Sequence, residues 1–128
     1  VFGGVGIINR RRVQLAHLSV LDTHTWAFLP LLPHPSSAPE PPPRVDHAIV
    51  VLNPGAEPAE PPAVLVHGGS SARGLLSDAH VATLHFTPGA RPGAVAGVRV
   101  RWTDCTARLR ELSPHPLAER IHHAIVAL

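Results

Sequence analysis

Short apolar runs of strand length alternate along the chain with polar and proline-rich segments. His47–Leu52 and Ala63–Val66 are continuous and β-branched, a pattern typical of strands buried on both faces. Val98–Trp102 instead alternates apolar residues with two arginines, which predicts a strand with one exposed, charged face. Helix formers at helical spacing occur only over Thr106–Leu112, about two turns. The pattern as a whole predicts an all-β fold.

Weaker apolar runs lie in two other regions. Leu18–Asp22 ends at an aspartate followed by Thr23, which is a turn signal, and Thr25–Leu29 then resumes the run. Another run begins near Ala79 and closes at Leu84–Phe86. We therefore expect two short strands joined by a turn in the first region and a further strand in the second.

Three proline-rich stretches separate the runs: Pro30–Pro43, Pro54–Pro62 and, more weakly, Pro88–Gly97. Proline has a fixed φ and no backbone N–H, so the longest stretch cannot be a helix or a central strand. We expect all three to be exposed, extended loops or insertions. Alternatively, Pro33–Pro43, which runs into Arg44, could serve as a polyproline ligand for another domain.

One segment occurs twice, 76 residues apart, with its members at the same spacing. The members are Trp26, Arg44 and His47–Val50 in the first copy, and Trp102, Arg120 and His123–Val126 in the second. A second repeated pair is Val1–Gly4 and Val66–Gly69, each of which closes a short apolar run with a double glycine. Repetition at this scale predicts an array of supersecondary units, each burying one face on its neighbour.

In order, the unit is Arg-x-x-His, an apolar run, a run closed by Gly-Gly, a short strand, and a strand with Trp. This order resembles the kelch repeat, a four-stranded antiparallel blade of a β-propeller. The residues that carry the resemblance are Gly3, Gly4, Trp26, Arg44, His47, Gly68, Gly69, Trp102, Arg120 and His123. A double glycine allows backbone conformations closed to other residues, and the tryptophan would fill the space between neighbouring sheets.

The resemblance implies a division of the chain into blade segments with proline-rich insertions. The expected parts are a partial blade (1–30), a proline-rich linker or insertion (31–43), a complete blade (44–103), an inter-blade connection (104–119) and the first strand of the next blade (120–128). Closed propellers use about 4–8 blades. We therefore expect further blades in the same polypeptide, of which this chain is a fragment.

The charge balance adds little about partners. The chain has 11 arginines and no lysine against 9 acidic residues, a formal net charge of only +2, so we do not expect nucleic-acid binding. A single cysteine excludes an internal disulfide, and no apolar run reaches the roughly 18 residues needed to span a bilayer. We expect an intracellular, cytoplasmic protein, with the nucleus as the alternative.

Ten histidines raise the question of a metal site. His122 and His123, with His115 upstream, have no cysteine partner and no helical i, i+4 pair. His80 and His85 are five residues apart and would point to opposite faces of a strand. We therefore expect no metal.

Catalytic motifs are equally weak. Ser77, Asp78 and His80 could be drawn as a nucleophilic triad, but no Gly-x-Ser-x-Gly elbow accompanies them, and the repeat predicts a strand start there. Gly68–Gly74 lacks the lysine and the following helix of a phosphate loop. Cys105 has no evident activating base, so we interpret it as an inert thiol. We expect no catalysis and no cofactor.

The Arg10–Arg12 run is the strongest candidate for binding. It follows the first double glycine in a loop between strands, and the equivalent loop of the next unit offers Ser70, Ser71 and Arg73. In kelch propellers such loops often form the partner-binding rim, and arginines there could hold an acidic or phosphorylated protein segment. The sequence thus favours a scaffold or adaptor. Two alternatives are a propeller appended to an enzyme whose catalytic domain lies elsewhere, and a structural subunit of a large assembly.

Overall fold

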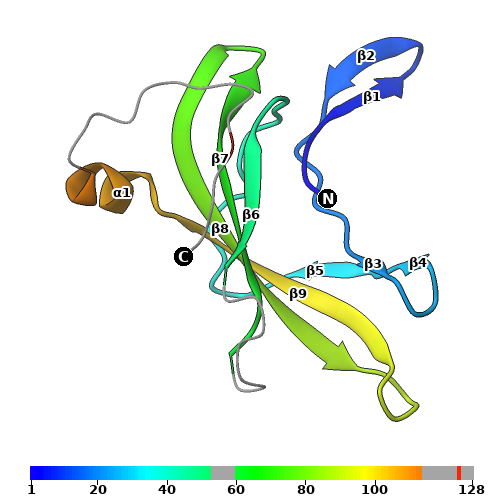
Figure 1. Cartoon of the computed structure of the whole chain (residues 1–128). Helices are drawn as coiled ribbons and strands as arrows, with labels where there is room; N and C mark the ends of the chain where they lie inside the picture. Colours follow the sequence, from blue (N-terminus) through cyan, green and yellow to red (C-terminus); the bar gives the residue numbers. More distant parts are fainter. Residues whose placement is uncertain (53–59, 114–123, 125–128) are drawn as a thin grey trace.

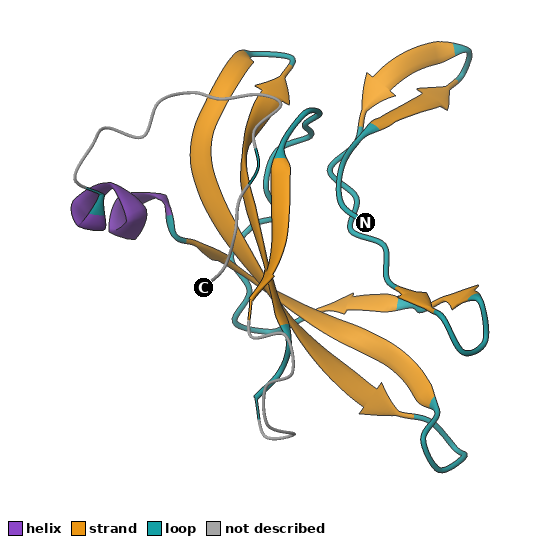
Figure 2. Cartoon of the chain, viewed as in Figure 1, coloured by secondary structure: helices purple, strands orange, loops and turns teal. Residues whose placement is uncertain are grey.

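The computed structural model describes residues 1–52, 60–113 and 124 (Figure 1). Its elements are β1 (Val5–Ile8), β2 (Arg11–Gln14), β3 (Leu21–Asp22), β4 (Ala27–Phe28), β5 (Leu31–Pro33), β6 (Ala48–Leu52), β7 (Ala63–Ser71), β8 (Gly74–Pro88), β9 (Val95–Asp104) and α1 (Thr106–Leu112). Strands predominate over the one short helix of these residues, so the predicted all-β class is confirmed (Figure 2). The helix covers the segment in which the sequence has helix formers.

The main sheet has the strand order β5-β9-β8-β7-β6. Strands β6 to β9 follow one another as an antiparallel meander, and they occupy the range in which a complete blade is predicted. Strand β5 adds to the outer side of β9 in parallel. The sheet does not close on itself within the described residues, and the propeller architecture stays a prediction.

The alternation along β9 is as predicted. Val98, Val100 and Trp102 are buried on one face of the sheet, whereas Arg99 and Arg101 are exposed on the other. The buried face belongs to a core that also receives side chains from the N-terminal segment and from β7 and β8. Its members are Phe2, Leu18, Val66, Ala82, Leu84, Val98, Val100 and Trp102.

Strand β6 departs from its prediction. The sequence predicts a strand buried on both faces, but Ile49 and Val51 are 45% and 50% exposed. The reason is its position, because among the described residues β6 pairs only with β7 and forms an edge of the main sheet. A continuous apolar run therefore marks an edge strand here, whose apolar side chains lack cover within the described residues.

The N-terminal segment forms two small hairpins beside the main sheet, β1–β2 and β3–β4 (Figure 1). The second of these confirms the predicted turn. Asp22 accepts hydrogen bonds from the backbone N–H of His24 and the hydroxyl of Thr25, which closes the chain between the two strands. At the base of the first hairpin, Phe2 and Leu18 form an antiparallel bridge and insert their side chains into the core.

Most residues of the proline-rich stretch at 30–43 are exposed, as predicted, but the stretch is also bound to the main sheet. It contains β5, and beyond that strand it stays bound to β9: Ala38 N–H donates to the Trp102 carbonyl, and Trp102 N–H donates to Ser37 Oγ, both at 2.9 Å. Pro41 is among the most completely buried residues of the chain. As expected for prolines, the stretch supplies only an edge strand. The stretch is therefore both exposed to solvent and attached to the fold through β9.

Candidate functional site

The two double glycines have the same backbone conformation. Gly3 and Gly68 have φ values of 67° and 63°, and Gly4 and Gly69 have values of 100° and 96°. Each pair leads directly into a hairpin, β1–β2 after the first and the tip of β7–β8 after the second. The internal repeat seen in the sequence is thus also a repeat of backbone geometry.

The segment from Arg44 to His47 lies between the two double glycines. A Cβ added to Gly3 would be 2.8 Å from the Arg44 carbonyl oxygen, and one added to Gly69 would be 2.6 Å from the Val45 carbonyl oxygen. Real Cβ atoms do not approach backbone oxygens this closely, so only glycine lets the segment pass between the hairpins. This contact explains why Gly-Gly and Arg-x-x-His occur together in the repeat.

Arg44 forms a joint between the β1–β2 hairpin, the first unit, and the β7–β8 hairpin, the second unit. Its backbone joins the first unit, because Gly4 N–H donates to the Arg44 carbonyl and Arg44 N–H donates to the Leu15 carbonyl. Its fully buried guanidinium joins the second unit, with Nη1 and Nη2 each 2.7 Å from a carboxylate oxygen of Asp78. Nη1 also donates to the Gly68 carbonyl at 2.9 Å. One side chain therefore holds both hairpins in a fixed relation.

The carboxylate of Asp78 is shared between two partners. It accepts the Arg44 fork, and its Oδ2 lies 2.8 Å from His80 Nε2. Burial acts to raise the pKa of Asp78, but the hydrogen bonds from Arg44 and His80 outweigh burial and hold the pKa well below its ordinary value. Asp78 is therefore a carboxylate that stabilises the fold. The possible triad of Ser77, Asp78 and His80 is not assembled, because Ser77 Oγ accepts a hydrogen bond from Arg110.

A groove of about 540 Å³ lies between the base of the β1–β2 hairpin and the tip of β7–β8. Gln14 of β2 bridges across, since its Nε2 is 3.4 Å from the Ser70 carbonyl oxygen. The lining residues are Gln14, Pro42, Pro43, Ser71, Ala72, Arg73 and Leu76. The groove combines apolar walls with the guanidinium of Arg73.

The predicted contact arginines are all exposed, but only partly in loops. Asn9 and Arg10 form the two-residue turn of the β1–β2 hairpin, with φ values of 50° and 62°. Arg11 and Arg12 belong to strand β2, so the prediction of a loop for them is wrong. The two-residue turn closes the hairpin as early as Ile8–Arg11, which converts the arginine run into strand. Arg73 lies in the corresponding turn of β7–β8.

The two predicted contact serines have local structural roles. Ser70 exchanges two backbone hydrogen bonds with Val45 and also accepts the bond from Gln14. The hydroxyl of Ser71 donates to the Gly74 carbonyl and accepts from Arg73 N–H, so it braces the turn. The structure brings these serines beside Arg73 but leaves the Arg10–Arg12 run on the other hairpin.

The two repeated tryptophans differ completely. Trp102 is 3% exposed and packs edge to face on Phe2 at a ring distance of 5.3 Å, while Phe2 also meets the ring of His47 at 5.5 Å. Trp26 is 76% exposed and lies in the β3–β4 turn with a φ of 57°, so its predicted place on a strand between sheets is wrong. Within the described residues, no aromatic ring packs on Trp26 in the way that Phe2 packs on Trp102. Arg120 and His123 lie outside the described residues.

The polyproline alternative stays a prediction. Pro41 and Arg44 are buried, and Arg44 Nε donates to the Pro42 carbonyl at 3.2 Å. Pro42 and Pro43, between them, are exposed.

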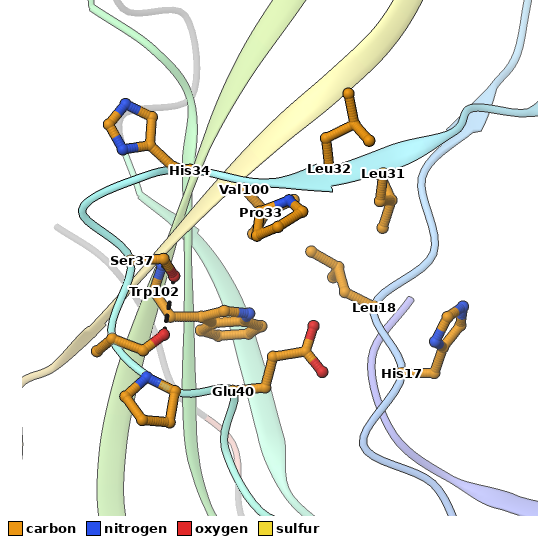
Figure 3. Close-up of a pocket in the computed structure, with 12 residues that line it drawn as sticks. His17, Leu18, Leu31, Leu32, Pro33, His34, Ser37, Glu40, Val100 and Trp102 are labelled. Carbon is orange, nitrogen blue, oxygen red and sulfur yellow. Dashed lines mark hydrogen bonds between the residues drawn. The ribbon is translucent and has the colours of Figure 1, made fainter.

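A second cavity, of about 560 Å³, separates the N-terminal segment from the outer strands. Figure 3 shows Leu18, Leu31 and Pro33 pointing into it above the ring of Trp102, whereas the ring of His34 turns away. Apolar side chains face each other across this space, and its polar side chains, such as His17 and Glu40, do not converge on a common point. The cavity is therefore a largely apolar space between the N-terminal segment and the outer strands.

The described residues show no group of three or more side chains suited to holding a metal ion. His80 and His85 point to opposite faces of β8, as their spacing predicts. Burial, followed by the charge of Asp104, raises the pKa of the Cys105 thiol, which keeps it protonated and poorly nucleophilic. In the part of the chain that the structure describes, no helix has both the length and the apolar character needed to cross a membrane.

Sequence reasoning missed Gln14, and it gave Leu76 and Asp78, which lie in the short strand of the repeat, no contact with Arg44 or with the groove. The ion pair of Asp78 could not be read from the sequence, because its partner is 34 residues away. No local pattern marks Gln14. No protein-family model, no curated protein and no solved structure matches this chain.

Proposed function

We propose that this chain is part of a kelch-like propeller scaffold that binds an acidic segment of a protein partner through its hairpin tips, without catalysis of its own. The observation that supports the proposal is the joint at Arg44. It fixes two double-glycine hairpins in relation to each other, and both carry exposed arginines. In Figure 1 the tips of β1–β2 and β7–β8 project toward the same end of the molecule.

The charge of these tips favours an anionic partner. Arg10, Arg11, Arg12 and Arg73 are exposed, and none of them forms an ion pair with another described residue. A guanidinium can form two parallel hydrogen bonds to one carboxylate, so several arginines on fixed hairpins can select a row of acidic side chains. Attraction between exposed charges is screened by salt over about 10 Å at 0.1 M, so binding should weaken as salt is added.

Apolar residues beside the arginines narrow the kind of partner. Ile7, which is 76% exposed, is opposite Arg12 in the β1–β2 hairpin, and Val5, 51% exposed, is on the same face. Cross-strand neighbours on one face lie about 5 Å apart at Cβ, so one ligand can touch both the arginine and the apolar side chain. A segment that mixes acidic with apolar residues therefore fits better than a purely acidic one.

The proposal can be tested by fluorescence anisotropy with a labelled peptide in which glutamate and leucine alternate. Arg10, Arg11 and Arg12 are changed together to Ala, and Arg73→Ala is made separately. A matched control changes Arg91, Arg108 and Arg110, which are also exposed, to Ala. We expect the first triple variant to bind about tenfold or more weakly, because each lost charge-assisted bond contributes about 1.5–3 kcal/mol before screening.

Stability and salt dependence complete the test. The free energy of unfolding should change by less than about 0.5 kcal/mol in either triple variant, because exposed positions contribute little to stability. Equal loss of affinity in both triple variants would show attraction to net charge alone. Unchanged affinity in the Arg10–Arg12 variant would remove the hairpin tip as the site.

A further inference from the structure

The outer strands of the main sheet carry a second basic cluster, away from the hairpin tips. Arg99 and Arg101 of β9 are exposed on the sheet face opposite to Trp102. His85 of β8 is paired with Arg99 across the strands. His34, directly after β5, has its ring 5.2 Å from that of His85 at an interplanar angle of 32°. Three strands thus bring four basic side chains to one face.

The strand register explains how the imidazoles meet. Strand β9 lies between β5 and β8, and Val100 turns its side chain to the other face, between the two arginines. The rings of His34 and His85 can therefore approach each other over the backbone at Val100. Arg99 and Arg101, two residues apart on the same face, leave the strand about 7 Å from each other. This spacing allows both guanidiniums to reach one small ligand.

The two arginines of the cluster, Arg99 and Arg101, form no ion pair within the described residues. The nearest acidic residue of β9, Asp104, is paired with His80 on the opposite face, and Asp78 is engaged by Arg44. On β5, β8 and β9, the nearest other side chains of the arginine face are uncharged: Leu32, Val81, Thr83, Thr87 and Thr103.

The hydrogen bonds of His34 set the direction in which its ring can donate. The backbone N–H of Ser36 donates to His34 Nδ1 at 3.2 Å. An N–H group can only donate, so Nδ1 is the acceptor and the neutral ring carries its proton on Nε2. Nε2 is therefore a donor even when His34 is uncharged. The cluster then offers an imidazole N–H in addition to two guanidinium forks.

We propose that Arg99, Arg101, His34 and His85 form a binding site for a single phosphomonoester group. A phosphomonoester is a compact dianion with three free oxygens, which suits two bidentate guanidiniums and a nearby N–H donor. A nucleic-acid strand would instead need basic side chains spread along a groove. The site is separate from the hairpin tips and does not depend on the partner proposed for them.

Isothermal titration of the purified chain with O-phosphoserine in low-salt buffer tests the site, with serine as the negative control. We expect saturable binding that inorganic phosphate displaces. The variant with Arg99→Gln and Arg101→Gln should bind about tenfold or more weakly. The matched control with Arg108→Gln and Arg110→Gln removes the same charge from the exposed face of α1 and should change the affinity less than about twofold.

A second variant and a second ligand class make the result specific. His85→Gln should weaken binding with both arginines in place, because the imidazole pair shapes the site. Equal weakening in the two double-arginine variants would overturn the proposal, since it would indicate charge alone. Tighter binding of a single-stranded RNA without terminal phosphates, lost with Arg99 and Arg101, would also overturn it in favour of a nucleic-acid surface. Either result leaves the hairpin-tip proposal intact.

Discussion

Replacing Arg44 by methionine tests whether the joint between the two units depends on one buried side chain. Methionine keeps most of the apolar stem but removes the guanidinium. The change abolishes the two 2.7 Å contacts to Asp78 and the bonds to the carbonyls of Gly68 and Pro42. The carboxylate of Asp78 would keep His80 as its partner, at 2.8 Å.

The expected cost follows from burial. Removing one partner of a buried ion pair destabilises a protein by about 3–5 kcal/mol. The Arg44 side chain is 0% exposed but that of Asp78 is 22% exposed, so water can partly compensate and the lower end applies. The Gly68 carbonyl loses its donor in the same event, and losses within one network are not additive. We expect the free energy of unfolding to fall by about 3–4 kcal/mol.

Urea denaturation followed by circular dichroism measures this change, provided that the slope against urea stays the same in both proteins. Arg108→Met is the matched control, because the 3.6 Å pair between Arg108 and Glu111 is 71% and 68% exposed and should contribute less than about 0.5 kcal/mol. Arg44→Lys should lie between the two, since lysine keeps the charge but not the fork. A loss below about 1 kcal/mol in Arg44→Met would refute the reasoning.

The lowered pKa of Asp78 makes the stability of the fold depend on pH. The pKa of Asp78 is lower in the folded chain than its ordinary value of 3.8, so the unfolded chain binds more protons in acid. The stabilisation is therefore present above about pH 4 and is lost as the pH falls below it. The difference in unfolding free energy between the wild type and Asp78→Asn should shrink from pH 5 to pH 3. A constant difference would contradict the assigned ion pair.

Two matched pairs of substitutions test the repeat. Trp102→Ala should cost about 3–5 kcal/mol because the ring is 3% exposed, whereas Trp26→Ala, at 76% exposed, should change stability by less than about 0.5 kcal/mol; similar costs would contradict the packing. Gly69→Ala should cost more than about 3 kcal/mol, because its Cβ would lie 2.6 Å from a backbone oxygen. A Cβ added to Gly4 would meet no atom within 4 Å, so Gly4→Ala should cost about 1–2 kcal/mol from its positive φ alone. Equal losses at the two glycines would argue against a steric role for the contact between Gly69 and the Val45 carbonyl. Urea denaturation measures all four variants.

How far the sequence predicts this protein depends on the range of each interaction. The alternation of Val98, Val100 and Trp102 with arginines predicted the buried and exposed faces of β9 correctly, because side chains alternate strictly along any strand. The repeat of Gly-Gly was equally readable, and the matching φ values of the two pairs bear it out. The tip arginines were identified as exposed candidates from sequence, but the two-residue turn that places Arg11 and Arg12 on a strand was not.

The sequence by itself determined the all-β class, most strand positions, the turn at Asp22 and the existence of an internal repeat, since each follows from local spacing and backbone preference. Only the tertiary structure decided the rest. Arg44 meets Asp78 across 34 residues, Ser37 meets Trp102 across 65, and the rings of His34 and His85 come together from non-adjacent strands. Such pairings depend on which strands become neighbours, and no period within a single strand encodes that choice.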